Sequence, residues 1–454
     1  LTSPSLRRTE ENRDGRRRRQ AGPRGGGSIR DRLSALPDEL LLRVLSFLPA
    51  QQVVRTTVLS KRWTDLWRSV PGINLSFLDF RSNLEEDWSA VWERMDDFVN
   101  NLLMLHRAPC LDAFRLVSVV DFDRHVDRWV RRAIKDDPLL PYLSSSPCRR
   151  LRSLHLNGVS LDHSFAERLH SWWPELKDLT LRNCCTVFCG IESDKLENLV
   201  VRYCIDQPAD VFAIKAPHLA SLSVQLGVPF SLDAGNSLVR ASISLNHGEF
   251  SPRSGAMLLG SLFNVTSFEW EYFQATAVLD EVFDEVPIFH NLRTLSLNSL
   301  FINNNKSGVC ELKALGRFLH KSPNLEKLML EGFKVVPVVD HIDFPILKNL
   351  RTLCLHFGNL NDNFQILLHC LRNSPNLEKL EILHCKLSDD SVGGKGKAQL
   401  KKTYSQSRNL ARFRCLKLEY AEISHYAEEA GVRELVSFLL DFAAPTITIK
   451  VTSL

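Results

Sequence analysis

The sequence predicts an α/β chain in which a small N-terminal module of three helices precedes a long array of repeating strands and helices, curved into a horseshoe or arc. Two observations predict this fold. Residues 31–70 contain three short apolar stripes at helical spacing, and after residue 150 one spacing of leucines recurs at intervals typical of repeat proteins. The chain has 454 residues, more than one compact core usually accommodates, so several domains or an extended array are expected.

Residues 1–30 are expected to form a disordered tail rich in arginine and glycine, because they show no apolar period. This segment contains nine arginines and three acidic residues, whereas the whole chain carries a net charge of only +4. The rest of the chain is therefore slightly acidic, which argues against a nucleic-acid partner. The arginine run at 16–19 could be a nuclear-import signal or a solubilising tail. No apolar stretch is long enough for a membrane span, so no membrane partner is expected.

The first apolar stripe predicts a helix between Pro37 and Pro49. Asp38 and Glu39 lie where the positive end of a helix favours acidic side chains, and Pro49 cannot continue a helix. A second stripe follows, and a third begins after Ser60, which could cap a helix. A segment this short cannot bury so many apolar side chains by itself. Part of it is therefore expected to form a surface that another protein, or the rest of this chain, covers.

Residues 31–75 resemble the F-box. The resemblance rests on three strings in the same order: D-R-L-S-A-L-P-D-E-L from residue 31, L-S-F-L-P from residue 45 and V-L-S-K-R-W from residue 58. An F-box is a small three-helix module that docks on the SKP-family adaptor of a cullin-RING ubiquitin ligase. The resemblance implies that the following residues divide between the core of the module and the adaptor interface: Leu36, Pro37, Leu40, Leu41, Val44, Leu45, Leu48, Pro49, Leu59, Trp63 and Trp67.

Residues 76–150 are expected to connect the F-box to the repeats and to pack on the first of them. Residues 88–102 and 126–134 show helical spacing, and residues 111–116 alternate as a short strand. The aromatic side chains of this region are expected to serve packing rather than ligand binding.

Residues 151–385 contain the recurring unit L-x-x-L-x-L, which resembles the leucine-rich repeat. Clear copies begin at Leu151, Leu176, Leu196, Leu219, Leu292, Leu325, Leu350 and Leu377, weaker copies begin at Leu238 and Val265, and a further weak copy begins beyond this range at Phe413. In a short strand the second and third leucines point to the same side, into a core shared with neighbouring strands, while the residues between them point outward. The resemblance implies an irregular solenoid.

Three copies place a cysteine eight positions after their first leucine, namely Cys184, Cys204 and Cys385. In a leucine-rich repeat this position holds a small buried side chain that satisfies the backbone where the chain turns out of the strand. These cysteines are therefore expected to be structural. The eleven cysteines of the chain lie without framework spacing, which fits reduced thiols and a location in the nucleus, the cytoplasm or both.

Residues 386–408 interrupt the repeats with a loop rich in glycine and lysine, and residues 409–454 are expected to form a last repeat and a cap. The pattern predicts a strand at 413–418, a helix around 435–440 and a final strand at 446–451. This order loosely resembles the C-terminal FBD region of plant F-box proteins. The whole chain thus resembles a plant-type F-box/leucine-rich-repeat protein.

The resemblance implies a non-catalytic substrate receptor of an SCF-type cullin-RING ubiquitin ligase. The F-box would dock on the SKP-family adaptor, and the concave face of the repeats would bind a protein substrate for ubiquitination. The substrate-binding residues expected on that face are Arg152, Lys177, Thr180, Arg182, Glu197, Arg293, Glu326, Lys327, Arg351 and Glu381. The alternative is a protein-binding scaffold that acts without ubiquitin transfer and has a degenerate or differently used F-box.

No catalytic, cofactor-binding or metal-binding residues are predicted. Cys184, Cys185, Cys189 and Cys204 lack the paired C-x-x-C spacing of a zinc site. The glycine and lysine run at 393–397 departs from the phosphate-binding pattern G-x-x-x-x-G-K-[ST]. No nucleophile motif is found either, which fits an adaptor.

Overall fold

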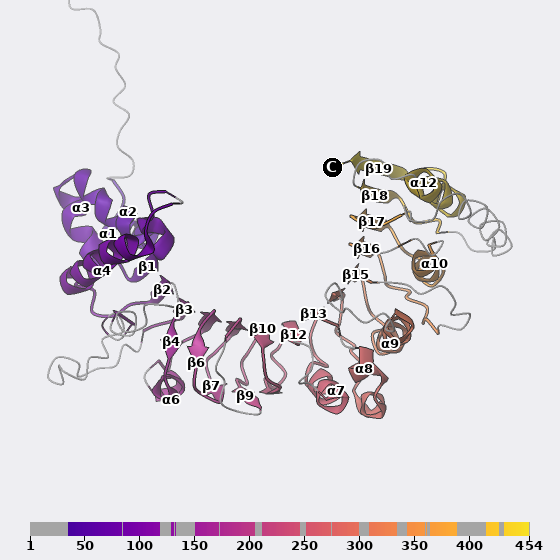
Figure 1. Ribbon diagram of the computed structural model, residues 1–454, viewed down its shortest axis with the longest axis horizontal. Coiled ribbons are helices and arrows are strands. Elements are labelled where there is room, and N and C mark those ends of the chain that lie inside the picture. The colour runs from indigo at the N-terminus through magenta and orange to yellow at the C-terminus, as the bar shows by residue number, and fades with distance from the viewer. Residues whose placement is uncertain are drawn as a thin grey trace, which may run out of the picture.

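The computed structural model describes residues 35–83, 85–118, 129–130, 132, 150–171, 173–204, 211–245, 251–273, 275–298, 308–333, 343–358, 360, 364–387, 415–425 and 431–453. They form an arc with helices at its N-terminal end and the last strand at its other end (Figure 1). The expected tail at 1–30, most of the helix expected at 126–134 and most of the loop expected at 386–408 lie outside these residues.

The N-terminal module begins with three α-helices, α1 (Asp38–Leu45), α2 (Ala50–Arg55) and α3 (Lys61–Leu66). The 3-10 turn η1 (Thr56–Val58) extends α2, and η2 (Trp67–Ser69) extends α3. A proline directly precedes both α1 and α2, where its fixed backbone angle and its missing N–H are tolerated. α1 ends at Leu45, four residues before Pro49, so Pro49 leads into the second helix rather than ending the first.

All three helices contribute side chains to the core of this module. The buried side chains include Leu41 and Leu45 of α1, Val53 of α2, Trp63 and Leu66 of α3, and Trp67 of η2. The same apolar cluster continues into the strands that follow, so the module is packed on the array rather than separated from it.

One sheet of 14 strands runs through the described part of the arc in chain order. Each strand pairs in parallel with the next. The strands are β1 (Gly72–Ser76), β2 (Ala113–Val117), β3 (Ser153–Asn157), β5 (Asp178–Arg182), β8 (Asn198–Arg202), β10 (Ser221–Leu226), β12 (Arg240–Leu245), β13 (Ser267–Glu271), β14 (Thr294–Asn298), β15 (Lys327–Glu331), β16 (Thr352–His356), β17 (Lys379–Leu383), β18 (Tyr420–His425) and β19 (Thr448–Ser453).

The strands of this sheet line the inner side of the arc, and most other elements cover its outer side (Figure 1). The helices and turns after the N-terminal module are η3 (Phe77–Phe80), α4 (Trp88–Leu105), α6 (His163–Ser171), α7 (Pro252–Ser261), α8 (Ala275–Leu279), η5 (Glu281–Glu285), α9 (Gly308–His320), α10 (Gln365–Arg372) and α12 (Gly431–Phe442). Two small sheets pair β4 (Ser160–Leu161) with β6 (Cys185–Thr186), and β9 (Phe212–Lys215) with β7 (Gly190–Glu192) and β11 (Phe230–Asp233).

The leucines of the recurring unit lie in the core, as predicted. In β3, Leu154 and Leu156 are fully buried, whereas the strand residues between and beside them are half-buried on the opposite face. The same alternation recurs in β5, β8, β14, β15 and β17. The period of two in the sequence thus corresponds to one buried face and one face toward the inside of the arc.

The structural role predicted for the three cysteines is confirmed. The Cys184 thiol lies 3.2 Å from the carbonyl oxygen of Arg182 and 3.6 Å from that of Leu156, on the neighbouring strand. Cys204 and Cys385 make the same pair of contacts, one to their own strand and one to the preceding strand. Each thiol therefore contacts carbonyl groups where the chain leaves the sheet.

The sheet begins earlier than residue 151, where the sequence predicts the first repeat. β1 lies within the range assigned to the F-box, and β2 lies within the connecting region, where the predicted strand is confirmed. Both segments carry the repeat spacing with other apolar residues, as Val70-Ile73-Leu75 and Leu111-Phe114-Leu116. The helix predicted at 88–102 is also confirmed, as α4.

The strand predicted at 413–418 is wrong in its described part, residues 415–418, since residues 413 and 414 lie outside the described residues. Residues 415–418 make an isolated bridge at Cys415, and the next strand of the sheet is β18. Leu416 is 63% exposed, whereas Leu418, Ala421 and Ile423 are buried. The repeat spacing therefore starts at Leu418, with alanine in place of one leucine. The last helix and strand are confirmed as α12 and β19, the strand lying two residues later than predicted.

The N-terminal module is joined to the sheet by backbone contacts. The N–H groups of Arg107 and Ala108 both donate to the carbonyl oxygen of Arg68, at 2.7 and 3.2 Å. At the start of β1, Gly72 approaches α1 so closely that a Cβ atom there would lie 3.0 Å from the Cβ of Ser46. These contacts hold the module at a fixed place on the end of the arc.

Candidate docking and recognition surfaces

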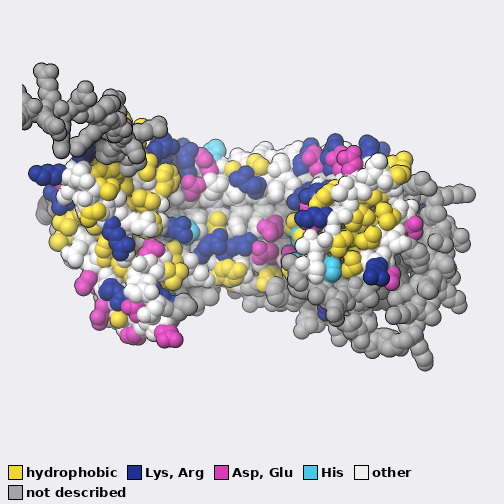
Figure 2. All heavy atoms as spheres, turned by 90° about the horizontal axis from the view of Figure 1, so that it is seen from above, with side chains coloured by type: hydrophobic (Ala, Val, Ile, Leu, Met, Phe, Trp, Pro, Cys, Tyr) yellow, Lys and Arg dark blue, Asp and Glu magenta, His cyan; other side chains and the backbone are white. Residues whose placement is uncertain are grey.

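An exposed apolar surface lies on the N-terminal module. Leu40, Val44 and Phe47 follow one another at helical spacing along α1 and its end, with 49%, 52% and 75% of their surface exposed. Val58 and Leu59, at the end of η1, are also exposed. Hydrophobic side chains are visible over this end of the arc (Figure 2). We call these five residues the apolar docking surface, since several exposed apolar side chains on one small module mark a site of protein interaction.

The structure divides the eleven predicted F-box residues into two groups. Leu41, Leu45, Trp63 and Trp67 are buried inside the module. Pro37, Leu40, Val44 and Leu59 are exposed, while Leu36, Leu48 and Pro49 are half-buried. Both tryptophans therefore support the fold of the module and do not reach its surface.

Two members of the docking surface, Phe47 and Val58, were not among the predicted residues. Phe47 stands seven positions after Leu40. This helical spacing was the signal that could have found it.

Arg62 on α3 fixes the start of α1. Its Nε donates to the Asp38 carboxylate at 2.8 Å, and its Nη2 donates to the carbonyl oxygen of Leu36 at 2.6 Å and to Asp38. These charge-assisted bonds span 24 to 26 residues of sequence. They hold the helix that carries most of the docking surface.

Four of the ten predicted substrate-binding residues lie on the strands that face the inside of the arc, and six do not. Thr180, Arg182, Lys327 and Glu381 occupy strand positions that alternate with the buried ones. The other six lie one residue before a strand, along the edge where the strands begin: Arg152, Lys177, Glu197, Arg293, Glu326 and Arg351.

Each of these six residues directly follows the first leucine of its copy, one position before the extended segment begins. Several of them pair along this edge. Lys177 lies 2.5 Å from Glu197, Arg293 lies 3.4 Å from Glu326, and Arg351 contacts Glu378. Such exposed ion pairs contribute little to stability.

The inner face carries positive charge toward its N-terminal half. Arg115, on β2, stands directly beside His155, on β3, and Arg182 lies nearby on β5. Burial, reinforced by these two arginines, lowers the pKa of His155 to about 4. The imidazole is therefore neutral at physiological pH, and the positive charge of this region comes from the arginines.

Acidic residues follow further along the same face. Burial, together with the carboxylates of Glu269 and Glu271, raises the pKa of Glu331. Where the two regions meet, Arg202 donates to the hydroxyls of Ser223 and Ser242 and lies 3.0 Å from Glu271. Basic and acidic side chains stand next to one another in the middle of the inner face (Figure 2).

Several charged or titratable residues of the inner face were not predicted, among them Arg115, His155, Arg202, Glu269, Glu271 and Glu331. All occupy strand positions that alternate with the buried ones, so the position within the repeat was the signal that could have found them.

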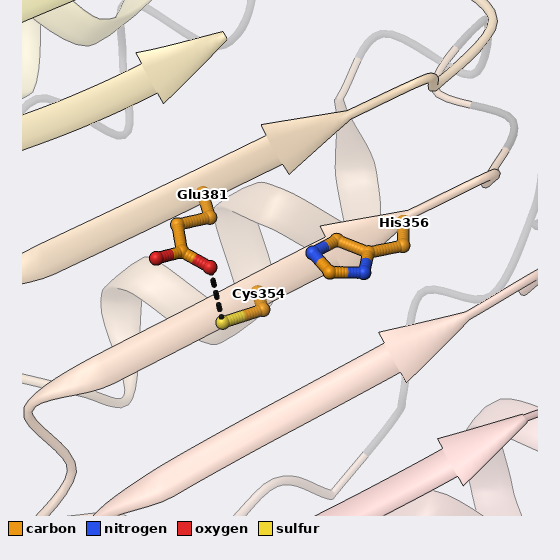
Figure 3. Close-up of side chains that lie close together, drawn as sticks. All are labelled: Cys354, His356 and Glu381. Carbon is orange, nitrogen blue, oxygen red and sulfur yellow. Dashed lines mark hydrogen bonds between the residues drawn. The ribbon is translucent and has the colours of Figure 1, made fainter. Parts of the chain in front are cut away.

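One group of metal-ligating side chains was found in the described residues. Cys354 and His356, on β16, and Glu381, on β17, bring their ligand atoms within 4.8 Å of one another. The Cys354 thiol lies 3.0 Å from Oε2 of Glu381 (Figure 3). Burial, and then the bond to Glu381, raise the pKa of Cys354 to about 12. Burial acts to raise the pKa of Glu381, but bonds from Lys379 and Cys354 outweigh it, and the pKa is lowered.

Among the helices that the structure describes, none has the length and apolar character that a bilayer crossing requires.

Comparisons with known proteins agree on one kind of protein. The F-box domain family matches residues 33–73. The MEIOTIC F-BOX protein MOF of Oryza sativa subsp. japonica is 29% identical over 357 residues, which cover 67% of this chain and 72% of that protein. An FBD-associated F-box protein of Arabidopsis thaliana is 27% identical over 82% of this chain and 92% of its own length.

An F-box/FBD/LRR-repeat protein of Arabidopsis thaliana is 32% identical over 44% of each chain. The F-box match covers the helices that carry the apolar docking surface, and the relatives extend the likeness into the strands of the sheet. The chain thus contains an F-box domain, and the proteins it is similar to are plant F-box proteins whose names include FBD and LRR-repeat.

Proposed function

We propose that this chain is a non-catalytic substrate receptor of an SCF-type cullin-RING ubiquitin ligase. In this proposal the F-box docks on an SKP-family adaptor, and the sheet with its outer elements is a leucine-rich-repeat solenoid whose inner face binds a protein substrate. The observation that carries the proposal is the apolar docking surface. It belongs to a module whose core is already filled by other side chains.

The docking surface has the character of a protein interface. Its members are large aliphatic and aromatic side chains, and the module gains nothing from exposing them to water. F-box domains in general bind SKP-family adaptors, which makes such an adaptor the partner that this surface fits. A few central apolar residues usually dominate the energy of such an interface.

The joint between the module and the sheet supports a role in positioning. Backbone bonds from Arg107 and Ala108 to Arg68, and the close approach of Gly72 to Ser46, tie the module to the start of the sheet. A receptor held in this way would present its substrate at a fixed distance from the ligase. Proximity of that kind raises the effective concentration of substrate lysines near the ubiquitin-loaded enzyme.

The charges of the inner face support a protein substrate with both signs of charge. A basic region around Arg115 and Arg182 adjoins an acidic region around Glu269 and Glu331. Complementary charge sets the orientation of a partner and excludes partners of the wrong pattern. The described cysteines are thiols rather than disulfides, which supports the proposed location in the nucleus or cytoplasm.

Co-purification with an SKP-family adaptor tests the proposal. We expect Val44→Asp to abolish binding of the full-length chain, because it places a charge in the docking surface. The matched control is Met257→Asp, since Met257 is comparably exposed, at 64%, but lies on α7. Circular dichroism should find both variants folded. Failure of the wild-type chain to bind any adaptor, or equal binding by Val44→Asp, would favour the alternative of a scaffold that acts without ubiquitin transfer.

A further inference from the structure

Cys354, His356 and Glu381 converge because of the register of the sheet. Cys354 on β16 pairs directly with Glu381 on β17. His356 stands two residues after Cys354, so its side chain points to the same face of the sheet. The three groups therefore come from adjacent strands that the backbone ladder holds in place, which is the rigid support that a metal site requires.

The imidazole of His356 points at the other two side chains. Its outer nitrogen, Nε2, is turned toward Cys354 and Glu381 (Figure 3). This atom is buried and has no hydrogen-bond partner among the described residues. An unsatisfied buried nitrogen costs free energy unless something binds it. A metal ion between the three side chains would supply that partner.

The carboxylate of Glu381 is already oriented. Its Oε1 accepts a hydrogen bond from Lys379 at 2.5 Å, and its Oε2 faces the thiol of Cys354. Outer hydrogen bonds of this kind commonly fix the ligands of metal sites. The ammonium groups of Lys379 and the nearby Lys327 oppose a cation, but the thiolate and the carboxylate supply two negative charges that would balance a divalent ion.

The donor set identifies the class of metal. A thiolate sulfur with an imidazole nitrogen suits zinc, whereas magnesium and calcium prefer oxygen ligands alone. Zinc bonds of about 2.0 to 2.3 Å place tetrahedral ligand atoms roughly 3.5 Å apart. The present separations reach at most 4.8 Å, so side-chain movements of about 1 Å would close the site.

We propose that Cys354, His356 and Glu381 form a zinc site on the inner face of the sheet, with a fourth coordination position that none of the three occupies. The metal takes the place of the thiol proton between Sγ and Oε2, and that proton leaves to solvent. Three protein ligands and one open position are the pattern of zinc sites that accept an outside ligand. The site lies far along the arc from the F-box, so it does not depend on adaptor docking (Figure 1).

Zinc titration of the full-length chain, stripped with a chelator and kept reduced, tests the proposal. Calorimetry should find one zinc ion for each chain at this site. We expect Cys354→Ser, His356→Gln and Glu381→Gln each to weaken binding at least tenfold, since even outer partners of a ligand typically change affinity 10-fold to 100-fold. The control is Cys189→Ser, because Cys189 is an exposed thiol outside the group.

Cobalt(II) provides an independent readout. A thiolate-to-cobalt charge-transfer band should be seen in the wild-type chain and lost in Cys354→Ser. Cys354 is fully buried, so if that variant fails to fold, the half-buried His356 and Glu381 variants decide the question. The proposal is overturned if the wild-type chain does not bind zinc. It is also overturned if the folded variants bind zinc as tightly as the wild type.

Discussion

Phe47→Ala should weaken binding of an SKP-family adaptor while leaving the fold intact. Phe47 is 75% exposed in the isolated chain, so its removal takes little from the core. Full burial of a phenylalanine side chain stabilises by up to about 3 kcal/mol. Binding of the adaptor would bury the exposed three-quarters of this side chain. Its removal should therefore weaken the binding free energy by about 2 kcal/mol, which raises Kd roughly 30-fold.

Titration of the purified adaptor into the wild-type and variant chains measures this loss directly. Thermal unfolding of both chains should agree within the scatter of surface substitutions, about 0.5 kcal/mol. A Kd within threefold of the wild type would refute the reasoning, because it would mean that the adaptor does not cover Phe47. A matching fall in thermal stability would refute it differently, by showing that Phe47 supports the module itself.

Three further predictions concern the core, the joint and the inner face. Trp63→Ala should lower the free energy of unfolding by about 3 to 5 kcal/mol, because this side chain is buried in the module, and denaturant titration measures it. Gly72→Val should cost about 1 to 3 kcal/mol by overpacking against Ser46, also seen in denaturant titration, whereas Gly227→Val, with open space around it, is the control. The pKa of His155 is lowered to about 4 in the folded chain, so the unfolded chain binds its proton more readily between pH 6.5 and 4. The free energy of unfolding should therefore decrease as the pH is lowered from 6.5 to 4. His155→Gln should make that decrease smaller. An NMR titration that finds the imidazole half-protonated near pH 6.5 would contradict the prediction.

The strands of the sheet could be predicted where leucine fills both buried positions. Leu154 and Leu156 are buried because a strand with one covered face must place apolar side chains at alternate positions. The leucine spacing did not reveal a strand where other apolar residues occupy the buried positions. In β18 the small Ala421 takes a leucine position, and in β1 the spacing is hidden within the apolar F-box segment.

The sequence predicted the residues of the docking surface together with residues of the module's core, without separating the two groups. Helix α1 has apolar residues on two faces, so the sequence could not tell Leu41 and Leu45, which are buried, from Leu40 and Val44, which are exposed. The difference arises from the direction in which α3 packs on α1. That direction is fixed by contacts far apart in sequence, including the bonds from Arg62 to Asp38 and Leu36.

The group at Cys354 shows what the repeat spacing does record. Cys354 and Glu381 are 27 residues apart, and the register between β16 and β17 makes them neighbours. Both residues stand four positions after the first leucine of their copies, Leu350 and Leu377, so the aligned copies place them side by side. In a parallel array every strand position is paired with the same position in the next repeat, so function on the inner face is set by columns of residues across repeats. Arg115 beside His155 and Glu381 beside Cys354 are two such columns. In the first, burial and then the arginine lower the pKa of the imidazole, and the second brings a thiol against a carboxylate, and each effect needs residues from two strands.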